Sequence, residues 1–252
     1  MAIREKAKKL EQTLRTLEKK YSRTVLPEGD TLLEKFVFYL LFYGNHVTNA
    51  KKAVKALTDP DVFGDWNEVR VATVRELEDT LTEHRVEQPS VFAARLKKFL
   101  QYVFEELDDT ALESVATLKP EKAKKFLAQL EGLPPWAPTY LLCALDMESM
   151  VPWDPHTERV AQRLRIVDPA APLAQRKKVL RAALQSVGEP DEDPLRLHHL
   201  FVEHGKKTCH EEDPKCLKCP LADDCDWHQR RSRGGSRTKA SGNGVEPPAK
   251  RK

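Results

Sequence analysis

The side chains with the clearest capacity for chemistry are four cysteines near the C-terminus. They follow the spacing Cys-x6-Cys-x2-Cys-x5-Cys within 17 residues, and they are Cys209, Cys216, Cys219 and Cys225. Iron–sulfur clusters are held by four thiolates on loops that match the corners of the cluster, whereas structural zinc sites more often use two short Cys-x2-Cys pairs far apart. One short pair between two longer loops therefore favours a 4Fe-4S cluster.

Two other uses of these cysteines stay open. Zinc is one, because His204, His210 and His228 flank the cysteines and one of them could replace a thiolate, although four cysteines already complete a zinc site. A pair of disulfides is the other. Disulfides require an oxidising compartment, and residues 1–6 are charged and lack the apolar core of a signal peptide.

The residues that lead into the cysteines form a long and specific pattern. Residues 198–209 read His-His-Leu-Phe-Val-Glu-His-Gly-Lys-Lys-Thr-Cys, and Cys-Pro-Leu follows at 219–221. This pattern and the 6-2-5 spacing resemble the cluster loop of the endonuclease III family, and Cys-Pro-Leu is similar to the adenine-glycosylase branch of that family. The resemblance implies that the four cysteines hold a 4Fe-4S cofactor.

Two segments upstream are also similar to that family. Residues 133–141, Leu-Pro-Pro-Trp-Ala-Pro-Thr-Tyr-Leu, lie where the family has its helix-hairpin-helix, and residues 154–163 resemble its Asp-x-His-x-x-Arg-Val-x-x-Arg. The resemblance thus spans about residues 30–228 and implies a DNA N-glycosylase of base-excision repair. The site residues that it implies are Asp154 and Thr139 for catalysis, and Trp136, Ala137 and His156 for binding DNA.

Asp154 has the properties that glycosylase chemistry requires. It precedes Pro155, which suits the first position of a helix, so we expect Asp154 at the N-cap, where backbone amides and the helix dipole keep a carboxylate ionised. A glycosylase takes its target nucleotide out of the stack and stabilises the positive charge that develops on the sugar as the base departs. Spacing alone favours a simple helix cap, and only the resemblance favours a catalytic role.

The position of the family's nucleophilic lysine departs from the pattern. Bifunctional members use a hairpin lysine to form a Schiff base, and Thr139 occupies that position here. No lysine lies between Lys125 and Lys177. We therefore expect a monofunctional enzyme without AP-lyase activity, in which Asp154 assists base departure and water attack and Thr139 lines the pocket.

The hairpin and the segment 40–46 depart from the family as well. Pro135 and Ala137 replace two glycines, and since proline has no N–H, the grip on a DNA phosphate is expected to be weaker. Trp136 between them could pack inward or stack on a nucleobase. The family's gap-filling glutamine is missing near Gly44, where Asn45 or His46 could act as a polar wedge or simply begin the next helix. These losses leave an alternative, a catalytically inactive 4Fe-4S nucleic-acid-binding protein on the same scaffold.

Apolar spacing predicts helices almost throughout the chain. Leu10, Leu14, Leu17 and Tyr21 follow the helical period, and no strand alternation is convincing. The chain is 40% hydrophobic, and its longest apolar run, residues 36–43, is far shorter than the roughly 20 residues that span a bilayer. We therefore predict an all-α, two-lobed helix-hairpin-helix DNA glycosylase fold with a C-terminal iron–sulfur cluster loop.

The predicted domains follow from the resemblance and from composition. They are an N-terminal helix (1–29) that packs on the cluster lobe, a helical barrel domain (30–150) with its hairpin at about 133–139, C-terminal helices with the cluster loop (151–228, the loop at 209–225), and a disordered basic tail (229–252). After Gln229, eight Lys or Arg face one Glu, a net charge of +7; subtracted from the +3 of the whole chain, this leaves −4 for residues 1–229.

The charge distribution predicts the kind of partner. Cations that displace counterions from phosphates supply most nonspecific affinity for nucleic acid, so we expect the tail, including Arg231 and Arg233, to bind DNA. The expected partner is double-stranded DNA, damaged, bound by a monomer that does not engage a membrane. The expected location is cytoplasmic, on the nucleoid in a bacterium or in the nucleus of a eukaryote.

Overall fold

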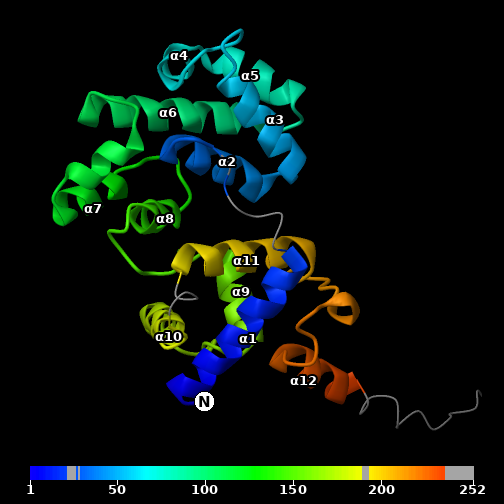
Figure 1. Ribbon diagram of the computed structural model, residues 1–252. Coiled ribbons are helices and arrows are strands. Elements are labelled where there is room, and N and C mark those ends of the chain that lie inside the picture. Colours follow the sequence, from blue (N-terminus) through cyan, green and yellow to red (C-terminus); the bar gives the residue numbers. More distant parts are fainter. Residues whose placement is uncertain (22–26, 28, 189–192, 236–252) are drawn as a thin grey trace, which may run out of the picture.

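The computed structural model describes residues 1–21, 27, 29–188 and 193–235, and these residues form an all-helical protein of two lobes (Figure 1). The upper lobe holds α2 (Leu32–Gly44), α3 (Val47–Leu57), α4 (Trp66–Val71), α5 (Val74–Glu83), α6 (Pro89–Leu107), the 3-10 turn η1 (Leu112–Thr117), α7 (Pro120–Ala128) and α8 (Ala137–Ala144). The lower lobe holds α1 (Ile3–Tyr21), α9 (Pro155–Arg163), α10 (Leu173–Gln185), α11 (Pro194–Lys207), η2 (Cys216–Lys218) and α12 (Asp226–Gly235). The predicted all-α class is confirmed.

The upper lobe is built around α2, which is apolar on nearly every side. Seven of its 13 residues are buried, and α6 and α8 lie beside it. A helix that is apolar all round belongs in the interior, which explains its central place. Shorter helices on the outside begin at polar caps; at α5, for example, the Thr73 and Glu76 side chains bond reciprocally in a capping box.

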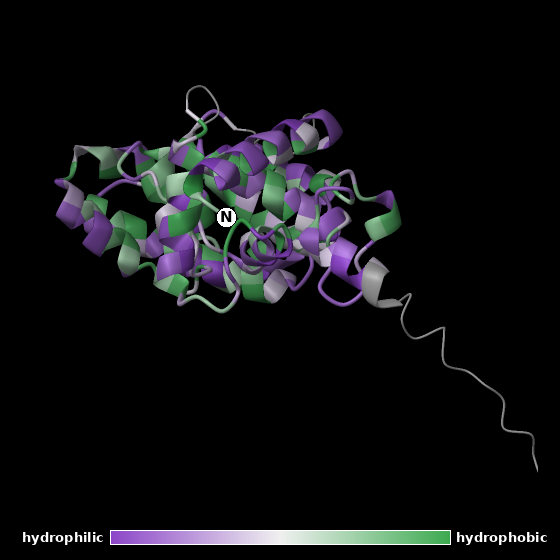
Figure 2. Cartoon of the chain, turned by 90° about the horizontal axis from the view of Figure 1, so that it is seen from below, coloured by the Kyte–Doolittle hydropathy of each residue, from purple (hydrophilic) through white to green (hydrophobic). Residues whose placement is uncertain are grey.

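The lower lobe packs α1 and α9 against α11. The heptad-like row that includes Leu10, Leu14 and Leu17 is wholly buried against α10 and α11. Hydrophilic and hydrophobic residues are interspersed along the helices, as expected where each helix buries one face and exposes the other (Figure 2). Lys9 and Gln12 on the outer side of α1 bond Asp226 and Asp224 at 2.8 and 3.0 Å, and these bonds tie the N-terminal helix to the C-terminal segment.

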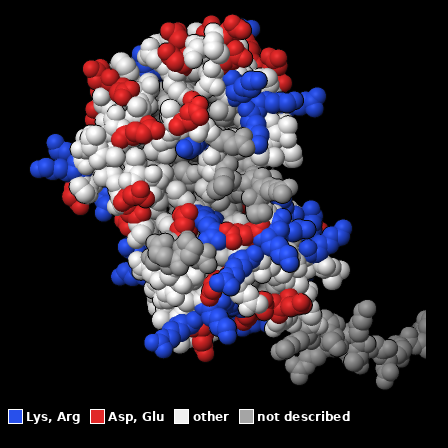
Figure 3. Space-filling view, viewed as in Figure 1, with Lys and Arg blue, Asp and Glu red and all other residues white. Residues whose placement is uncertain are grey.

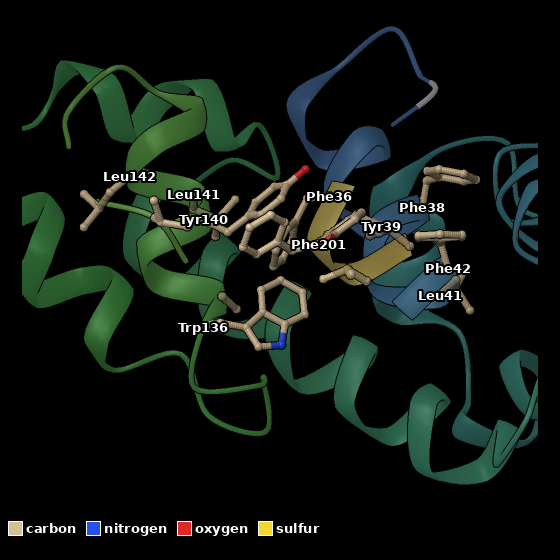
Figure 4. Close-up of a cluster of buried hydrophobic side chains, with 14 of the residues drawn as sticks. Phe36, Phe38, Tyr39, Leu41, Phe42, Trp136, Tyr140, Leu141, Leu142 and Phe201 are labelled. Atoms are coloured by element: carbon tan, nitrogen blue, oxygen red, sulfur yellow. The ribbon is translucent and has the colours of Figure 1, made fainter. Parts of the chain in front are cut away.

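The two lobes meet in a cluster of aromatic side chains. Tyr39 of α2 stacks on Tyr140 of α8 with ring centroids 4.8 Å apart, and Trp136 meets Tyr39 edge-on at 5.5 Å (Figure 4). Phe201 of α11 is wholly buried beside them (Figure 4). Because each fully buried large side chain contributes roughly 1.5–3 kcal/mol, this cluster holds the lobes in a fixed relation.

The end of the chain differs from the prediction. Residues 229–235, predicted to begin a disordered tail, lie in α12. The physical reason is an aromatic anchor: the Trp227 ring has the guanidinium of Arg163 at 4.4 Å and that of Arg231 at 4.6 Å, contacts that favour an ordered helix. Residues 236–252 of the predicted tail lie outside the described residues. Within the described part, no helix has the length and apolarity needed to cross a membrane.

Candidate functional site

Asp154 lies at the N-cap of α9, as its sequence context predicts. Its backbone is extended (φ −123°, ψ 171°), and Pro155 follows at the first helical position. Oδ1 accepts the Thr157 N–H at 2.7 Å, and Oδ2 accepts the His156 N–H at 3.1 Å. The carboxylate thus binds two of the amides that a helix start leaves unpaired.

Two side chains from other helices complete the surroundings of this carboxylate. The Tyr43 hydroxyl at the end of α2 donates to Oδ2 at 2.7 Å, and His198 Nδ1 of α11 lies 3.7 Å from Oδ1. Asp154 is only 2% exposed. Burial alone would raise the pKa of Asp154, but His198, the amide and hydroxyl of Thr157 and the Tyr43 hydroxyl outweigh it, so that pKa lies below its usual range. Asp154 is therefore an ionised carboxylate inside the protein.

His198 and Tyr43 are both held in their neutral forms. Burial lowers the pKa of His198 to about 4, and its Nδ1 lies 3.1 Å from Thr157 Oγ1. Burial and the charge of Asp154 raise the pKa of Tyr43 far above its ordinary value. Tyr43 therefore stays protonated and donates to Asp154 at any working pH.

The hairpin residues predicted to contact DNA face the interior. Trp136 is 3% exposed, and its ring centroid lies 5.1 Å from that of Tyr43 and 5.5 Å from that of His198. Of its two predicted orientations, the inward one is correct. Ala137 is wholly buried, whereas Pro135 is exposed. Neither Trp136 nor Ala137 therefore presents a surface to a DNA duplex in this conformation, because the aromatic cluster encloses both.

The other predicted site residues are less buried. Thr139 is half-buried in the first turn of α8, and no hydrogen bond in the described part of the chain joins it to Asp154. The half-buried His156 ring packs on α11, and its Nδ1 lies 2.8 Å from Arg159 Nη2. Arg231 is exposed on α12, and Arg233 lies in the same helix with its side chain outside the described part. Among these residues, His156 bonds Asp154 directly, because the carboxylate accepts the His156 N–H.

Neither Asn45 nor His46 acts as a polar wedge in this conformation. Asn45 is buried; its Nδ2 donates to the Leu41 carbonyl at 2.7 Å and its Oδ1 accepts the Glu87 N–H at 2.6 Å. These bonds tie α2 to the loop before α6, so Asn45 is a structural residue. His46 is the N-cap of α3, with Nδ1 accepting the Thr48 N–H. The simpler interpretation, a helix end followed by a helix start, is confirmed.

Tyr43 and His198 are the site residues that sequence reasoning missed. Tyr43 lies inside the segment that departs from the family, and His198 begins the pattern that leads into the cysteines. The sequence shows both residues but does not show that their side chains lie next to Asp154. Tyr43 is 111 residues from Asp154, and His198 contacts residues 41 and 44 positions before it, Thr157 and Asp154.

The four cysteines line one small cavity of about 20 Å³ together with His204, His228 and Trp227. All five cysteines of the chain are free thiols. Arg163 directs an N–H to Cys209 Sγ at 3.2 Å, and the Leu221 N–H points to Cys219 Sγ at 3.4 Å. Such donors stabilise thiolate ligands and tune a bound cluster. The residues present therefore fit a thiolate-bound group.

The four thiols do not form a preassembled ion site. In the described residues, no three or more His, Cys, Asp or Glu side chains converge as ligands of one metal ion. Burial raises the pKa of Cys219 to about 11, so binding any metal group there must expel its proton.

Two arginines of α9 hold the loop that carries these cysteines. Arg159 Nε donates to the Cys209 carbonyl at 2.8 Å, and Arg163 donates to the carbonyls of His210 and Glu211 at 2.6 and 2.8 Å. A segment with little apolar content of its own is thus fixed by charged hydrogen bonds to the helix that Asp154 caps. Asp154 therefore lies at the start of α9, and the last turns of the same helix hold the cysteine loop.

Comparisons with known proteins agree with this architecture. No family model matches the chain. It is similar to Endonuclease III of Sulfolobus acidocaldarius, with 28% identity over 131 residues that cover 52% of this chain and 56% of that protein. It is also similar to DNA glycosylase/AP lyase ROS1 of Arabidopsis thaliana, with 25% identity over 174 residues, 64% of this chain and 12% of that protein. The chain thus spans about half the length of this Endonuclease III and about an eighth of the length of ROS1.

In three dimensions the chain is similar to an Endonuclease III solved in a non-covalent complex with DNA. The TM-score is 0.65 at 17% identity, over 90% of this chain and 98% of that one. The match covers both lobes, so the predicted two-lobed helix-hairpin-helix glycosylase fold is confirmed.

Proposed function

We propose that this chain, which is endonuclease III-like in sequence and fold, is a DNA N-glycosylase that hydrolyses the bond between a damaged base and its sugar. The observation that carries the proposal is the ionised Asp154 carboxylate, placed where the two lobes meet and at the start of α9. A carboxylate with a lowered pKa in a site of low polarity is suited to stabilising positive charge.

The chemistry that we propose for Asp154 is hydrolysis. As the bond from the sugar C1′ to the base nitrogen breaks, its electron pair leaves with the base and positive charge grows on the sugar. The carboxylate stabilises that charge and accepts a proton from the water that bonds to C1′. The departing base takes up a proton from water and Asp154 returns its proton to the solvent, so the products are the free base and an abasic site.

A strand-cutting step is not part of the proposal. Thr139 cannot form a Schiff base, and the chain has no lysine between Lys125 and Lys177. The proposed enzyme is therefore monofunctional.

We propose that the four cysteines hold a 4Fe-4S cluster. Support comes from their common cavity and from the N–H groups of Arg163 and Leu221 directed at two of the sulfurs. A bound cluster would stabilise the folded conformation of the loop at 209–225 and would take no part in the reaction at the base. Arg159 and Arg163 hold that loop from the outside.

The proposed substrate is damaged double-stranded DNA, bound by a monomer wherever the cell keeps its chromosome. Lys and Arg side chains gather over α3 and on the same side of the lower lobe (Figure 3). Exposed lysines on these parts include Lys52 and Lys55 of α3 and Lys207, Lys215 and Lys218 near the cysteine loop. Phosphate contacts of this kind predict affinity that falls steeply as salt rises.

A panel of lesions tests the proposal. Anaerobically purified protein is incubated with duplexes that carry uracil, thymine glycol, 8-oxoguanine opposite adenine, or alkylated bases, and strand breaks are read with and without hot alkali. We expect breaks on at least one lesion only after alkali. Breaks without alkali would show a lyase step and contradict the monofunctional proposal.

One observation favours a second function, that of a catalytically inactive 4Fe-4S nucleic-acid-binding protein. The Asp154 side chain has no exposed surface, and Tyr43, His198 and two amides occupy its oxygens. A carboxylate so enclosed is also what a purely structural cap looks like. Binding to DNA without release of any base would support this second function.

A further inference from the structure

Tyr43 separates the Asp154 carboxylate from an open cavity. One end of its ring carries the hydroxyl that donates to Asp154 at 2.7 Å. The ring also forms part of the wall of a cavity of about 240 Å³, lined further by residues that include Leu40, Val91, Phe92, Phe99 and Pro134. That cavity lies in the upper lobe, between the end of α2, the start of α6 and the hairpin.

The other groups around the carboxylate are fixed in place. His198 and Thr157 are wholly buried within α11 and α9. Trp136 is held among three aromatic rings, at 5.1 Å from Tyr43, 5.5 Å from Tyr39 and 5.9 Å from Tyr140. Moving any of these side chains would open a packed interior, which costs several kcal/mol.

Tyr43 differs from these neighbours in its freedom to move. It is half-buried in the last turn of α2, whereas His198, Thr157 and Trp136 are buried. Its contacts with Trp136 and His156 are ring contacts at 5.1 and 5.5 Å. The cavity that this ring lines gives it space to turn into, at the cost of its contacts with Trp136 and His156.

We propose that Tyr43 is the gate of the Asp154 site: in the free protein its hydroxyl covers the carboxylate, and its ring turns into the adjoining cavity when a flipped-out nucleotide enters. The inference rests on the proposed function, since an uncovered carboxylate matters only if Asp154 acts on a substrate. It makes Tyr43 a residue that controls access to the reacting group.

The gate can be tested without DNA, by labelling carboxylates with a water-soluble carbodiimide and an amine and reading each position by peptide mass spectrometry. The exposed Asp193 carboxylate gives the reference rate. In the wild-type protein we expect Asp154 to be protected. Hydrogen bonds to charged groups contribute about 1.5–3 kcal/mol, so Tyr43→Phe should speed labelling of Asp154 roughly tenfold or more relative to Asp193.

Two further variants make the result decisive. Tyr43→Ala removes the ring and should speed labelling beyond Tyr43→Phe. Tyr140→Phe is the matched control, because it removes a buried hydroxyl that bonds His199 at 3.0 Å in the same aromatic cluster and leaves Asp154 covered. Equal labelling in wild type and both Tyr43 variants would overturn the gate, and so would acceleration by Tyr140→Phe. Neither result depends on glycosylase activity, so failure of the gate and failure of the proposed function are separate outcomes.

Discussion

The His156 ring lies directly against the backbone of Gly205, so close that a Cβ on residue 205 would come within 2.4 Å of Nδ1 and 2.8 Å of the His156 Cβ. This contact joins α9 to α11 beside the Asp154 cap. It explains why glycine follows His204 in the pattern that precedes the cysteines: no other residue leaves room for the imidazole.

Gly205→Ala should therefore destabilise the protein even though alanine favours helices. Overpacking of this kind costs about 1–3 kcal/mol, which lowers the thermal midpoint of a protein of this size by several degrees. Gly44→Ala is the control, because its Cβ would meet nothing within 4 Å. If both variants melt with the wild type, the close packing of His156 on α11 is wrong.

Two buried tyrosines of the aromatic cluster should respond oppositely to loss of the hydroxyl. The Tyr39 hydroxyl is buried without a hydrogen-bond partner in the described part of the chain, whereas that of Tyr140 bonds His199 at 3.0 Å. Tyr39→Phe should leave the free energy of unfolding unchanged or raise it, and Tyr140→Phe should lower it by about 1–3 kcal/mol. Urea unfolding of the two variants measures the difference, and a reversed order would contradict the hydrogen bonding described.

Stability should fall when the pH drops from about 6.5 toward 4. Burial lowers the pKa of His198 from 6.5 to about 4 and that of His199 well below 6.5. In this range the unfolded chain binds protons that the folded protein does not, so each histidine contributes a slope of up to about 1.4 kcal/mol per pH unit. His198→Asn should flatten the pH dependence of the urea midpoint between pH 7 and 5; an unchanged slope would show that His198 is not the buried neutral base described.

Metal content separates the cluster from its rivals. Protein purified without oxygen should contain iron and acid-labile sulfide in equal amounts, and Cys219→Ser should lose both. Cys143→Ser is the matched control, because Cys143 lies outside the cavity and its thiol donates to the Met150 carbonyl at 2.9 Å. Zinc in place of iron would support the zinc interpretation instead, and the thermal midpoint should follow metal content in either case.

The sequence was sufficient for features that depend on local pattern. The cysteine spacing and the Asp154-Pro155 start of α9 both lie within short stretches; the structure places Asp154 at the N-cap and the four cysteines around one cavity. Tyr43 could not be assigned, because its hydrogen bond to Asp154 joins residues 111 positions apart. The tail boundary was wrong for a different reason: basic composition suggested disorder, but contacts with Trp227 extend α12 to Gly235.

The central claim is that the charge of Asp154 acts on the substrate, and single-turnover base release by Asp154→Asn tests it most directly. Asparagine caps helices about as well as aspartate, so the variant keeps the start of α9 and loses the charge together with one of the two acceptor oxygens. Asp193→Asn is a close control, since Asp193 also caps a helix that begins with proline. On a lesion that the wild type processes, we expect Asp154→Asn to release base about 10²–10³-fold more slowly and Asp193→Asn to match the wild type. Equal rates for all three proteins would mean that Asp154 is only a cap, and the catalytic account would fall.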